Sequence, residues 1–356
     1  MIVVRSPGRV NIIGEHTDYA LGYVMPMAVQ LGLTMVSEPS TSGVTCVLSD
    51  AMGEERCFGD ELRREGAWID YVKGVYHAIR LHGLRPVNVR ARISGDLPMG
   101  SGLSSSAALE MAVAVTQNEL GRLGLGRIQL AELGRAAENE FLGVPSGILD
   151  QLAIMVAEEG RAVFADTETL SYELVPVPSD IEFLVFHTGV RRSLSGTGYS
   201  ERVATVRSAL SRLGVRSSKE VREEHLARLT ELERRRLGYV IRENARVLAA
   251  KDALRSGRVD ELGRLLTEAH RDLAVNYEVS TPELDFFVNF AVSHGAYGAR
   301  LTGAGFGGAA IALVDKGKGE LLGRETAEEY SRRFPHRPSY WAVRPAQGAR
   351  VIEVRP

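Results

Sequence analysis

The stretch that most constrains this chain is residues 97–110, LPMGSGLSSSAALE, in which glycines and serines run directly into a helix-forming sequence. Glycines let the backbone approach an anion closely, and the free N–H groups at the positive end of a helix favour phosphate. A plain turn closed by a serine N-cap is the simpler alternative. Because two glycines, a proline and three consecutive serines exceed what a cap needs, we predict a phosphate-binding loop followed by a helix.

This loop is not one of the common nucleotide-binding motifs. No Gly-Lys-Ser or Gly-Lys-Thr occurs, which excludes a Walker A loop, and the protein-kinase signatures are also missing. The segment GAGFGG, residues 303–308, fits the GxGxxG pattern, but the strand-like AAIALV follows it, whereas a dinucleotide fingerprint opens a helix. We therefore interpret this segment as a tight turn between strands, or as a loop whose backbone approaches a ligand.

Charged residues crowd the end of a predicted first strand. In SPGRVNIIGEHTDYALGY, residues 6–23, Arg9 precedes the apolar VNII, and Glu15, His16 and Asp18 follow it. We expect the apolar residues to bury in the core of the first domain and to fix the position of the charged residues after them. Carboxylates and imidazole are acceptor-rich groups suited to binding hydroxyls. Taken alone, the stretch is also compatible with an ordinary charged loop.

Two carboxylates in AAENEFLGVPSGILDQL, residues 136–152, are further candidates. Asp150 comes directly after the turn VPSGI among apolar neighbours, a setting in which partial burial and a nearby arginine can tune a general base. A helix N-cap explains an aspartate after a turn equally well. Glu138, in a predicted helix, fits a solvated helix face better than a metal site when it is taken alone.

Composition limits the classes of function. With 356 residues, the chain is longer than a domain with a single hydrophobic core usually is, so we expect two domains. Its formal net charge of −2 provides no basic field for nucleic acid or an anionic membrane. Cys46 and Cys57 form no CxxC pair, so we expect reduced cysteines and a cytoplasmic location. The sequence shows no signal-peptide core at its start and no apolar run long enough to span a membrane.

Hydrophobic periodicity predicts an α+β chain. Short strands dominate the first part, with separate runs in GYVMPMAV and GLTMVS, and two long helices follow the glycine-serine loop. The second half is mostly helical from Tyr199 to about His294 and ends in strands. Because PVPSD, residues 176–180, breaks the pattern, we place a boundary there. Residues 1–178 then form one domain and residues 179–356 the other.

Three segments, PGRVNIIGEHTDYALGYVMPMA, LPMGSGLSSSAALE and LTGAGFGGAAIAL, resemble the GHMP kinases in order and spacing, from Arg5 to about Leu313. GRVNIIGEHTDY and VPSGILDQ are similar to signatures of the galactokinase branch. The resemblance implies an N-terminal domain like ribosomal protein S5 domain 2 and a ferredoxin-like C-terminal domain. It implies an ATP-dependent sugar 1-kinase that phosphorylates the anomeric hydroxyl of α-D-galactose with Mg²⁺ as cofactor. It also implies a cytoplasmic monomer or weak homodimer that binds neither nucleic acid nor membrane.

The resemblance assigns functional residues position by position. Arg9 and Asp150 take the catalytic roles, Arg9 offsetting charge on the moving phosphate and Asp150 accepting the hydroxyl proton. The other implied sites are Glu15, His16, Thr17, Asp18, Gly147, Asp150 and Tyr199 for the sugar, Gly100, Ser101, Gly102, Leu103, Ser104, Ser105 and Ser106 for ATP, and Ser106 and Glu138 for Mg²⁺.

Some positions depart from the pattern of this branch. Many galactokinases read DYNGGYV where this chain reads DYALGYV, and Ser146 stands in place of a usual cysteine. We expect Ala20 and Leu21 to alter the rim of the sugar pocket, which leaves a kinase for N-acetylgalactosamine, arabinose or a uronic acid as an alternative. A non-catalytic galactose and ATP sensor is disfavoured, because the Ser106-Ala107 pair that such sensors lose is intact.

Overall fold

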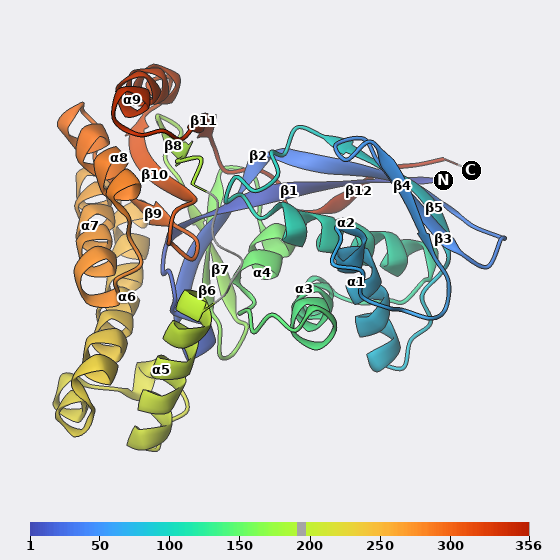
Figure 1. The fold of residues 1–356 in the computed structure, drawn as a ribbon, viewed down its shortest axis with the longest axis horizontal. Helices are drawn as coiled ribbons and strands as arrows, with labels where there is room; N and C mark the ends of the chain where they lie inside the picture. Colours follow the sequence, from blue (N-terminus) through green and yellow to red (C-terminus); the bar gives the residue numbers. More distant parts are fainter. Residues whose placement is uncertain (191–196, 356) are drawn as a thin grey trace.

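The protein, described by a computed structural model over residues 1–190 and 197–355, is built on two β-sheets covered by helices (Figure 1). Within these residues, the first sheet has eight strands; six follow the order β12-β1-β2-β5-β3-β4, while β6 pairs with β2 and β7. The second sheet has four antiparallel strands in the order β11-β8-β10-β9. This mixture of helices with largely antiparallel sheets confirms the predicted α+β class.

Runs of strands and runs of helices follow one another along the chain. The strands are β1 (Ile2–Ile13), β2 (Tyr23–Pro39), β3 (Thr45–Ser49), β4 (Glu54–Phe58), β5 (Val89–Gly95), β6 (Arg161–Asp166), β7 (Tyr172–Pro176), β8 (Ile181–His187), β9 (Gly298–Thr302), β10 (Ala309–Asp315), β11 (Ser339–Val343) and β12 (Arg350–Val354). The α-helices are α1 (Ile69–Leu81), α2 (Ser105–Leu120), α3 (Arg127–Ala136), α4 (Leu149–Val156), α5 (Thr197–Leu213), α6 (Glu231–Arg255), α7 (Val259–Asp272), α8 (Pro282–Ser293) and α9 (Gly319–Arg333). In the described part of the chain, no helix is both long and apolar enough to cross a membrane.

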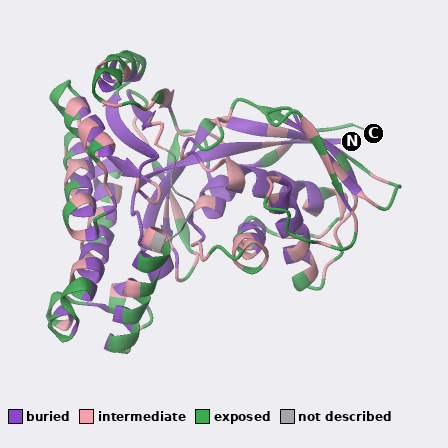
Figure 2. Ribbon diagram, viewed as in Figure 1, coloured by how far each residue is buried: buried purple, intermediate pink, exposed green. Residues whose placement is uncertain are grey.

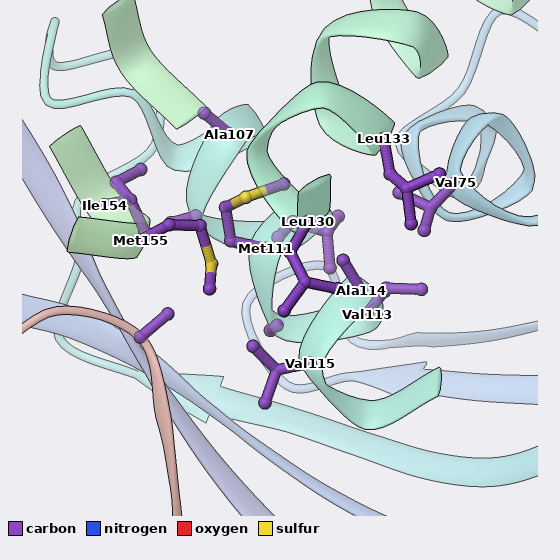
Figure 3. Packing of buried hydrophobic residues seen from close by; sticks show 14 of the residues in the cluster. Val75, Ala107, Met111, Val113, Ala114, Val115, Leu130, Leu133, Ile154 and Met155 are labelled. Carbon is purple, nitrogen blue, oxygen red and sulfur yellow. The ribbon is translucent and has the colours of Figure 1, made fainter. Parts of the chain in front are cut away.

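Helix α2 lies at the centre of the core of the first half. Its residues Ala107, Met111 and Val115 are buried and belong to one apolar cluster with Leu130 of α3 and Ile154 of α4 (Figure 3). Figure 2 shows that the faces of the helices toward the sheets are buried while their outer faces are exposed. Because α2 is enclosed by its neighbours, the loop that leads into it is held at a fixed place.

The first two strands are longer than the sequence pattern predicts. GYVMPMAV and GLTMVS, expected as separate strands, form the single strand β2, which pairs with β1 along most of its length and with β5 in its second half. Pro26 lies opposite Asn11, beside a shift in the β1–β2 register, so the ladder tolerates a residue without an N–H group. Strand β1 ends at Ile13, directly before the charged segment at residues 14–18.

A core shared by both halves encloses the apolar residues at the end of β1. Val10, Ile12 and Ile13 belong to one buried cluster with Phe183 and Val185 of β8. The expectation that they serve only a first-domain core is therefore wrong, because β1 contacts α6, α7 and β9 of the second half. The last strand, β12, returns to pair with β1 in the first sheet. The boundary between residues 178 and 179 stays a prediction.

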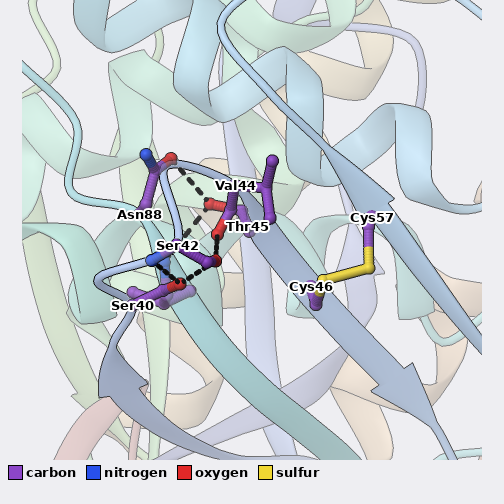
Figure 4. Close-up of a disulfide and its surroundings, with 8 residues drawn as sticks. Ser40, Ser42, Val44, Thr45, Cys46, Cys57 and Asn88 are labelled. Carbon is purple, nitrogen blue, oxygen red and sulfur yellow. Dashed lines mark hydrogen bonds between the residues drawn. A yellow bond between two sulfur atoms is a disulfide. The ribbon is translucent and has the colours of Figure 1, made fainter.

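Cys46 and Cys57 form a disulfide bond (Figure 4), so the expectation of two reduced cysteines is wrong. The two residues are direct partners in the β3–β4 hairpin, and their Cα atoms are 4.1 Å apart. The two cysteines are 11 residues apart in the sequence, and this spacing does not by itself indicate a disulfide bond. Only the register of the hairpin brings the two side chains together, which is why the sequence pattern did not reveal the bond.

We expect the Cys46→Ser, Cys57→Ser double variant to lose about 2–3 kcal/mol of the free energy of unfolding, because the cross-link lowers the entropy of the unfolded chain. Urea unfolding of the parent and the variant, each with and without a reductant, measures this loss. The reductant should destabilise only the parent. Equal stability of the oxidised parent and the double variant would contradict the stabilising role of the bond.

Candidate active site

A pocket of about 240 Å³ is built from both halves of the chain. The segment after β1 and the turn before α4 meet there with α5 and with the turn between β9 and β10. Its lining residues are Arg9, Glu15, His16, Asp18, Tyr19, Glu138, Val144, Ser146, Gly147, Leu149, Asp150, Gln151, Tyr199, Gly303 and Ala304. The structure thus brings together every predicted sugar and catalytic residue except Thr17.

Arg9 and Asp150 form a bidentate ion pair in this pocket. Arg9 Nε donates to Asp150 Oδ1 at 2.5 Å, and Nη2 donates to Oδ2 at 2.7 Å. Arg9 Nη1 also donates to the Gly102 carbonyl at 2.8 Å, and Ser104 Oγ donates to Asp150 Oδ2. Such bidentate pairing fixes the geometry of both groups. Asp150 lies inside α4, whose N-cap is Ile148, so the alternative role of Asp150 as a helix cap is excluded.

The glycine-serine loop reaches this ion pair at the start of α2. Gly100 and Gly102 have φ angles of 68° and 83°, in the left-handed region that favours glycine. A Cβ on Gly102 would lie 2.8 Å from the Cβ of Ala309, so the loop is also closely packed there. Within the loop, Ser101 Oγ donates to the Pro98 carbonyl at 2.7 Å, which stabilises the loop conformation. Ser104 precedes α2 but makes no side-chain capping bond, which argues against the plain serine N-cap.

Glu15 is held by the turn that GAGFGG forms between β9 and β10. Its Oε1 accepts from the Gly303 N–H at 2.6 Å and from Thr302 Oγ1 at 3.0 Å. Its Oε2 accepts from Asn11 Nδ2 at 2.7 Å. The motif is therefore a strand–strand turn, as predicted, and it opens no helix for a dinucleotide. With three acceptor positions occupied, Glu15 keeps only part of its capacity for a ligand.

His16 is fixed within an aromatic cluster. Its Nε2 lies 3.1 Å from the Ala304 carbonyl and its Nδ1 lies 3.0 Å from Tyr19 Oη. Because a carbonyl only accepts, Nε2 donates there and Nδ1 accepts from the tyrosine. The Tyr199 ring centroid is 5.8 Å from that of His16, which places this predicted sugar residue against the imidazole. Burial raises the pKa of Tyr19 and Tyr199 well above the usual range, so both hydroxyls stay protonated.

Thr17 is not part of the pocket lining, unlike its neighbours in the charged segment. Its side chain is buried, and its hydroxyl bonds the carbonyls of Gly14 at 2.9 Å and of Tyr23 at 2.6 Å. These bonds close the turn that directs Glu15 and Asp18 into the pocket. Thr17 therefore shapes the site through the backbone, and its direct contact with the sugar stays only a prediction.

Ala20 and Leu21 also lie outside the pocket lining. Ala20 is buried in the apolar cluster of the second half, beside Tyr19. Leu21 comes after the short helix at residues 18–20, and its carbonyl accepts from Ser217 Oγ at 2.9 Å. Because neither residue lines the pocket, the expectation that these two departures alter the pocket rim has no support in the structure and stays a prediction.

Asp18 faces the backbone of Gly147. A Cβ built on Gly147 would lie 1.8 Å from Asp18 Oδ2, so only glycine leaves room for this carboxylate. Burial raises the Asp18 pKa from 3.8 to about 6, and the negative charge of Asp150 adds to the rise. The pocket therefore holds a carboxylate whose ionisation is resisted by its surroundings.

Glu138 lines the pocket, so its interpretation as a solvated helix face is wrong. A π-helical turn over residues 137–142 interrupts the helical path after α3 and carries this side chain inward. Ser146 Oγ donates to Glu138 Oε2. Burial raises the Glu138 pKa to about 7; the Ser146 hydrogen bond opposes the rise and the charge of Asp150 adds to it. A bound cation would relieve this repulsion.

The oxygen donors of Ser106 and Glu138 are of the kind that Mg²⁺ prefers. Ser106 lies in the first turn of α2 and is partly exposed. Among the described residues, no group of three or more His, Cys, Asp or Glu side chains is arranged to hold a metal. Mg²⁺ is commonly held by one or two protein groups together with substrate phosphates, so this sparse donor set fits it.

Sequence reasoning missed the polar groups beneath the pocket. Gln151 lines the pocket, and its Nε2 donates to Oε2 of the fully buried Glu110 at 3.0 Å. Burial raises the Glu110 pKa well above its usual range, and the charge of Glu138 adds to the rise. A glutamate inside the otherwise apolar run of α2 is the signal that could have pointed to them. Ser146 stands out in the sequence only as a departure from the family pattern.

Comparisons with known proteins agree with this geometry. Family models match as the galactokinase galactose-binding signature over residues 1–39, the GHMP kinases N terminal domain over residues 70–158 and the GHMP kinases C terminal over residues 250–332. Galactokinase of Thermococcus kodakarensis is 53% identical, and the alignment covers 98% of this chain and 99% of that protein. This chain belongs to the galactokinases of the GHMP kinase family. The prediction of a kinase is confirmed.

Further relatives support the same assignment. Galactokinase of Pyrococcus furiosus is 48% identical over 98% of this chain and 99% of that protein. A crystal structure of Lactococcus lactis galactokinase complexed with galactose matches with a TM-score of 0.92 and 34% identity, over 98% of this chain and 94% of that one. A mevalonate kinase structure, at 19% identity and a TM-score of 0.67 over 97% of this chain and 99% of that one, shares the fold alone. The predicted two-domain GHMP kinase fold is confirmed.

The raised pKa of Asp18 predicts a pH-dependent stability. Between about pH 4 and pH 6 the folded kinase keeps a proton on Asp18 that the unfolded chain has lost, so the free energy of unfolding falls as pH rises through this range. We expect the decrease in the free energy of unfolding from pH 4.5 to pH 7.5 to be roughly 2 kcal/mol smaller in Asp18→Asn than in the parent. Urea unfolding at pH 4.5 and 7.5 measures it, with the exposed Asp180→Asn as control. Equal pH dependence in Asp18→Asn and the parent would refute the assignment.

The close approach of Gly147 to Asp18 predicts a binding defect. In Gly147→Ala the new Cβ would displace the Asp18 carboxylate, so we expect galactose to bind at least about tenfold more weakly. Calorimetric titration with galactose measures the change. Gly126→Ala is the matched control, because its Cβ would meet only an ordinary contact at 3.6 Å. Unchanged galactose affinity in Gly147→Ala would show that Asp18 does not bind the sugar.

Proposed function

We propose that the kinase transfers the γ-phosphate of ATP to the anomeric hydroxyl of α-D-galactose and releases galactose 1-phosphate. The observation that carries this proposal is the ion pair of Arg9 and Asp150, which stands between the pocket and the glycine-serine loop through Gly102 and Ser104. The similarity to galactokinases, one of them solved with galactose, supports galactose as the acceptor.

Asp150 accepts the proton of the reacting hydroxyl. Arg9 and Ser104 both donate to its carboxylate and hold it in place, and 31% of the Asp150 side chain stays exposed, so the carboxylate is accessible to a substrate. The Arg9 guanidinium also offsets the negative charge on the phosphoryl group during transfer. Phosphoryl transfer depends mainly on positioning and on such charge neutralisation, so a rigid pair suits the reaction.

The sugar is recognised by polar groups of the pocket. Asp18 accepts from sugar hydroxyls, while His16 and Tyr199 form the wall beside it. Glu15 is already bonded by Asn11, Thr302 and Gly303, so it offers one remaining acceptor position in a fixed direction. A site of this kind rejects an epimer, because a misplaced hydroxyl leaves a buried polar partner unmatched.

The ATP phosphates bind at residues 100–106 and the N-terminus of α2. Left-handed glycines open this loop to an anion, and the helix end favours negative charge. Ser106 and Glu138 hold Mg²⁺, which neutralises phosphate charge when it is bound. Ser146 orients Glu138 by donating to its carboxylate. We infer a cytoplasmic location, because ATP is the phosphate donor, and a monomer or weak homodimer stays a prediction.

A panel of acceptor sugars tests the substrate. We expect the highest kcat/KM for galactose among galactose, glucose, N-acetylgalactosamine, arabinose and galacturonic acid, measured as ATP consumption. A higher value for any other sugar would move the assignment to that related kinase. No turnover on any of them would overturn the proposed function.

Two variants test the catalytic pair on galactose. We expect Asp150→Asn to lower kcat at least about 100-fold, the usual effect of losing a general base. Arg9→Ala should also lower kcat, because it removes a positive charge that stabilises the transferring phosphate. The exposed Asp180→Asn is the control and should keep the parental rate. Undiminished turnover in Asp150→Asn would contradict its role as the base.

A further inference from the structure

A second cavity, of about 470 Å³, lies away from the sugar pocket and shares no lining residue with it. One part of its wall comes from β1 and β2, where Arg5, Val29 and Gln30 face it. Other parts come from the turn at residues 159–160 and from Lys316 after β10. The cavity is thus bordered by elements of both halves of the kinase.

Both connections between the two sheets border this cavity. Residues 177–180 join β7 of the first sheet to β8 of the second, and residues 344–349 carry the chain back from β11 to β12. Val177, Pro178 and Ser179 of the first connection line the cavity, as do Arg344 and Pro345 of the second. A molecule bound here would contact both connections at once.

Hydrogen bonds hold the wall of the cavity in place. Gln30 Nε2 donates to the Ala342 carbonyl at 2.9 Å, and Gln30 Oε1 accepts from the Arg344 N–H at 2.9 Å. The Gly160 N–H donates to the Pro345 carbonyl at 3.2 Å. These bonds tie the second connection to β2 and to the turn before β6, so the cavity is a built feature of the fold.

The charge of the lining is strongly positive, although the whole chain carries a formal net charge of −2. Arg5, Lys316, Arg344 and Arg350 face one carboxylate, that of Glu159. Arg5 is paired with Asp96 at 2.9 Å. Within the described part of the chain, the side chains of the other three cations lie in no ion pair. Arginine and lysine gathered without carboxylate partners favour phosphate.

Apolar side chains complete the walls between the cations. They are Pro7, Val29, Val177, Ile181 and Pro345. A pocket with apolar walls and a few convergent polar groups is typical of a site for a small organic molecule. Inorganic phosphate alone would leave most of a cavity of about 470 Å³ unused. The volume and chemistry therefore fit a phosphate group attached to an organic body.

We propose that this cavity is a second ligand site of the kinase, which binds a small organic phosphate through Lys316, Arg344 and Arg350 and bridges the two connections between the sheets. The site is independent of the proposed sugar and ATP positions.

Calorimetric titration of the whole kinase tests the site with three probes: pyrophosphate, galactose 1-phosphate and AMP. We expect at least one of the two organic phosphates to bind, and the Lys316→Glu, Arg344→Glu double variant to bind it at least about tenfold more weakly. The control is Arg207→Glu, Arg324→Glu, which makes the same charge change at exposed positions of α5 and α9. It should bind like the parent.

The comparison of the probes identifies the source of the phosphate. Preference for galactose 1-phosphate indicates a sugar phosphate, and preference for AMP indicates a nucleotide. Equal binding in the cavity variant and the parent, or binding of pyrophosphate alone, would overturn the proposal. An unchanged thermal midpoint shows that the cavity variant is folded. Its turnover without added ligand should equal that of the parent, so failure of this site is distinct from failure of the proposed kinase reaction.

Discussion

The ion pair of Arg9 and Asp150 is the interaction on which the rest of the site depends. It joins the end of β1 to α4, and the contacts to Gly102 and Ser104 add the glycine-serine loop. Removing two charges from water is costly, and removing one partner leaves the other unpaired, so such a pair persists only with well-placed hydrogen bonds. Here Arg9 also donates to the Gly102 carbonyl, and Asp150 also accepts from the Ser104 hydroxyl. One ion pair therefore sets the distance between the acceptor pocket and the phosphate loop.

A second buried network sets the other wall of the pocket. The fully buried Arg300 of β9 donates from Nη1 to the Ile12 carbonyl at 2.9 Å, and its Nη2 lies 3.8 Å from both Glu15 and Glu243. Glu243 of α6 accepts from the Gly14 N–H at 2.9 Å. The charged segment after β1 is thus held by groups of the second half. These contacts hold Glu15 in the pocket lining, although β1, which precedes it, belongs to the first sheet.

Local elements of this fold could be predicted, and distant pairings could not. Helix α2 after the glycine-serine loop and the β9–β10 turn can be read from periodicity and glycine placement, which act within a few residues. The disulfide, the return of β12 to β1 and the shared core depend on register between distant segments. The same contrast between local and distant information applies to the candidate site. Motifs identify its charged residues, but the orientations of Thr17, Ala20 and Leu21 depend on hydrogen bonds and packing that no motif records.

The charge of the pocket bears on which sugar it accepts. Among the residues that the structure describes, Glu15, Asp18, Glu138 and Asp150 line it together with the guanidinium of Arg9. Burial is the main cause of the raised pKa values of Asp18 and Glu138, and the negative charge of Asp150 adds to both rises. An acceptor with its own carboxylate would add a further negative charge, at a cost of several kcal/mol for close charges in a partly buried site. The carboxylates among the described residues therefore argue for the proposed neutral sugar rather than a uronic acid, and ATP, itself a polyanion, needs the cation that Ser106 and Glu138 are proposed to hold.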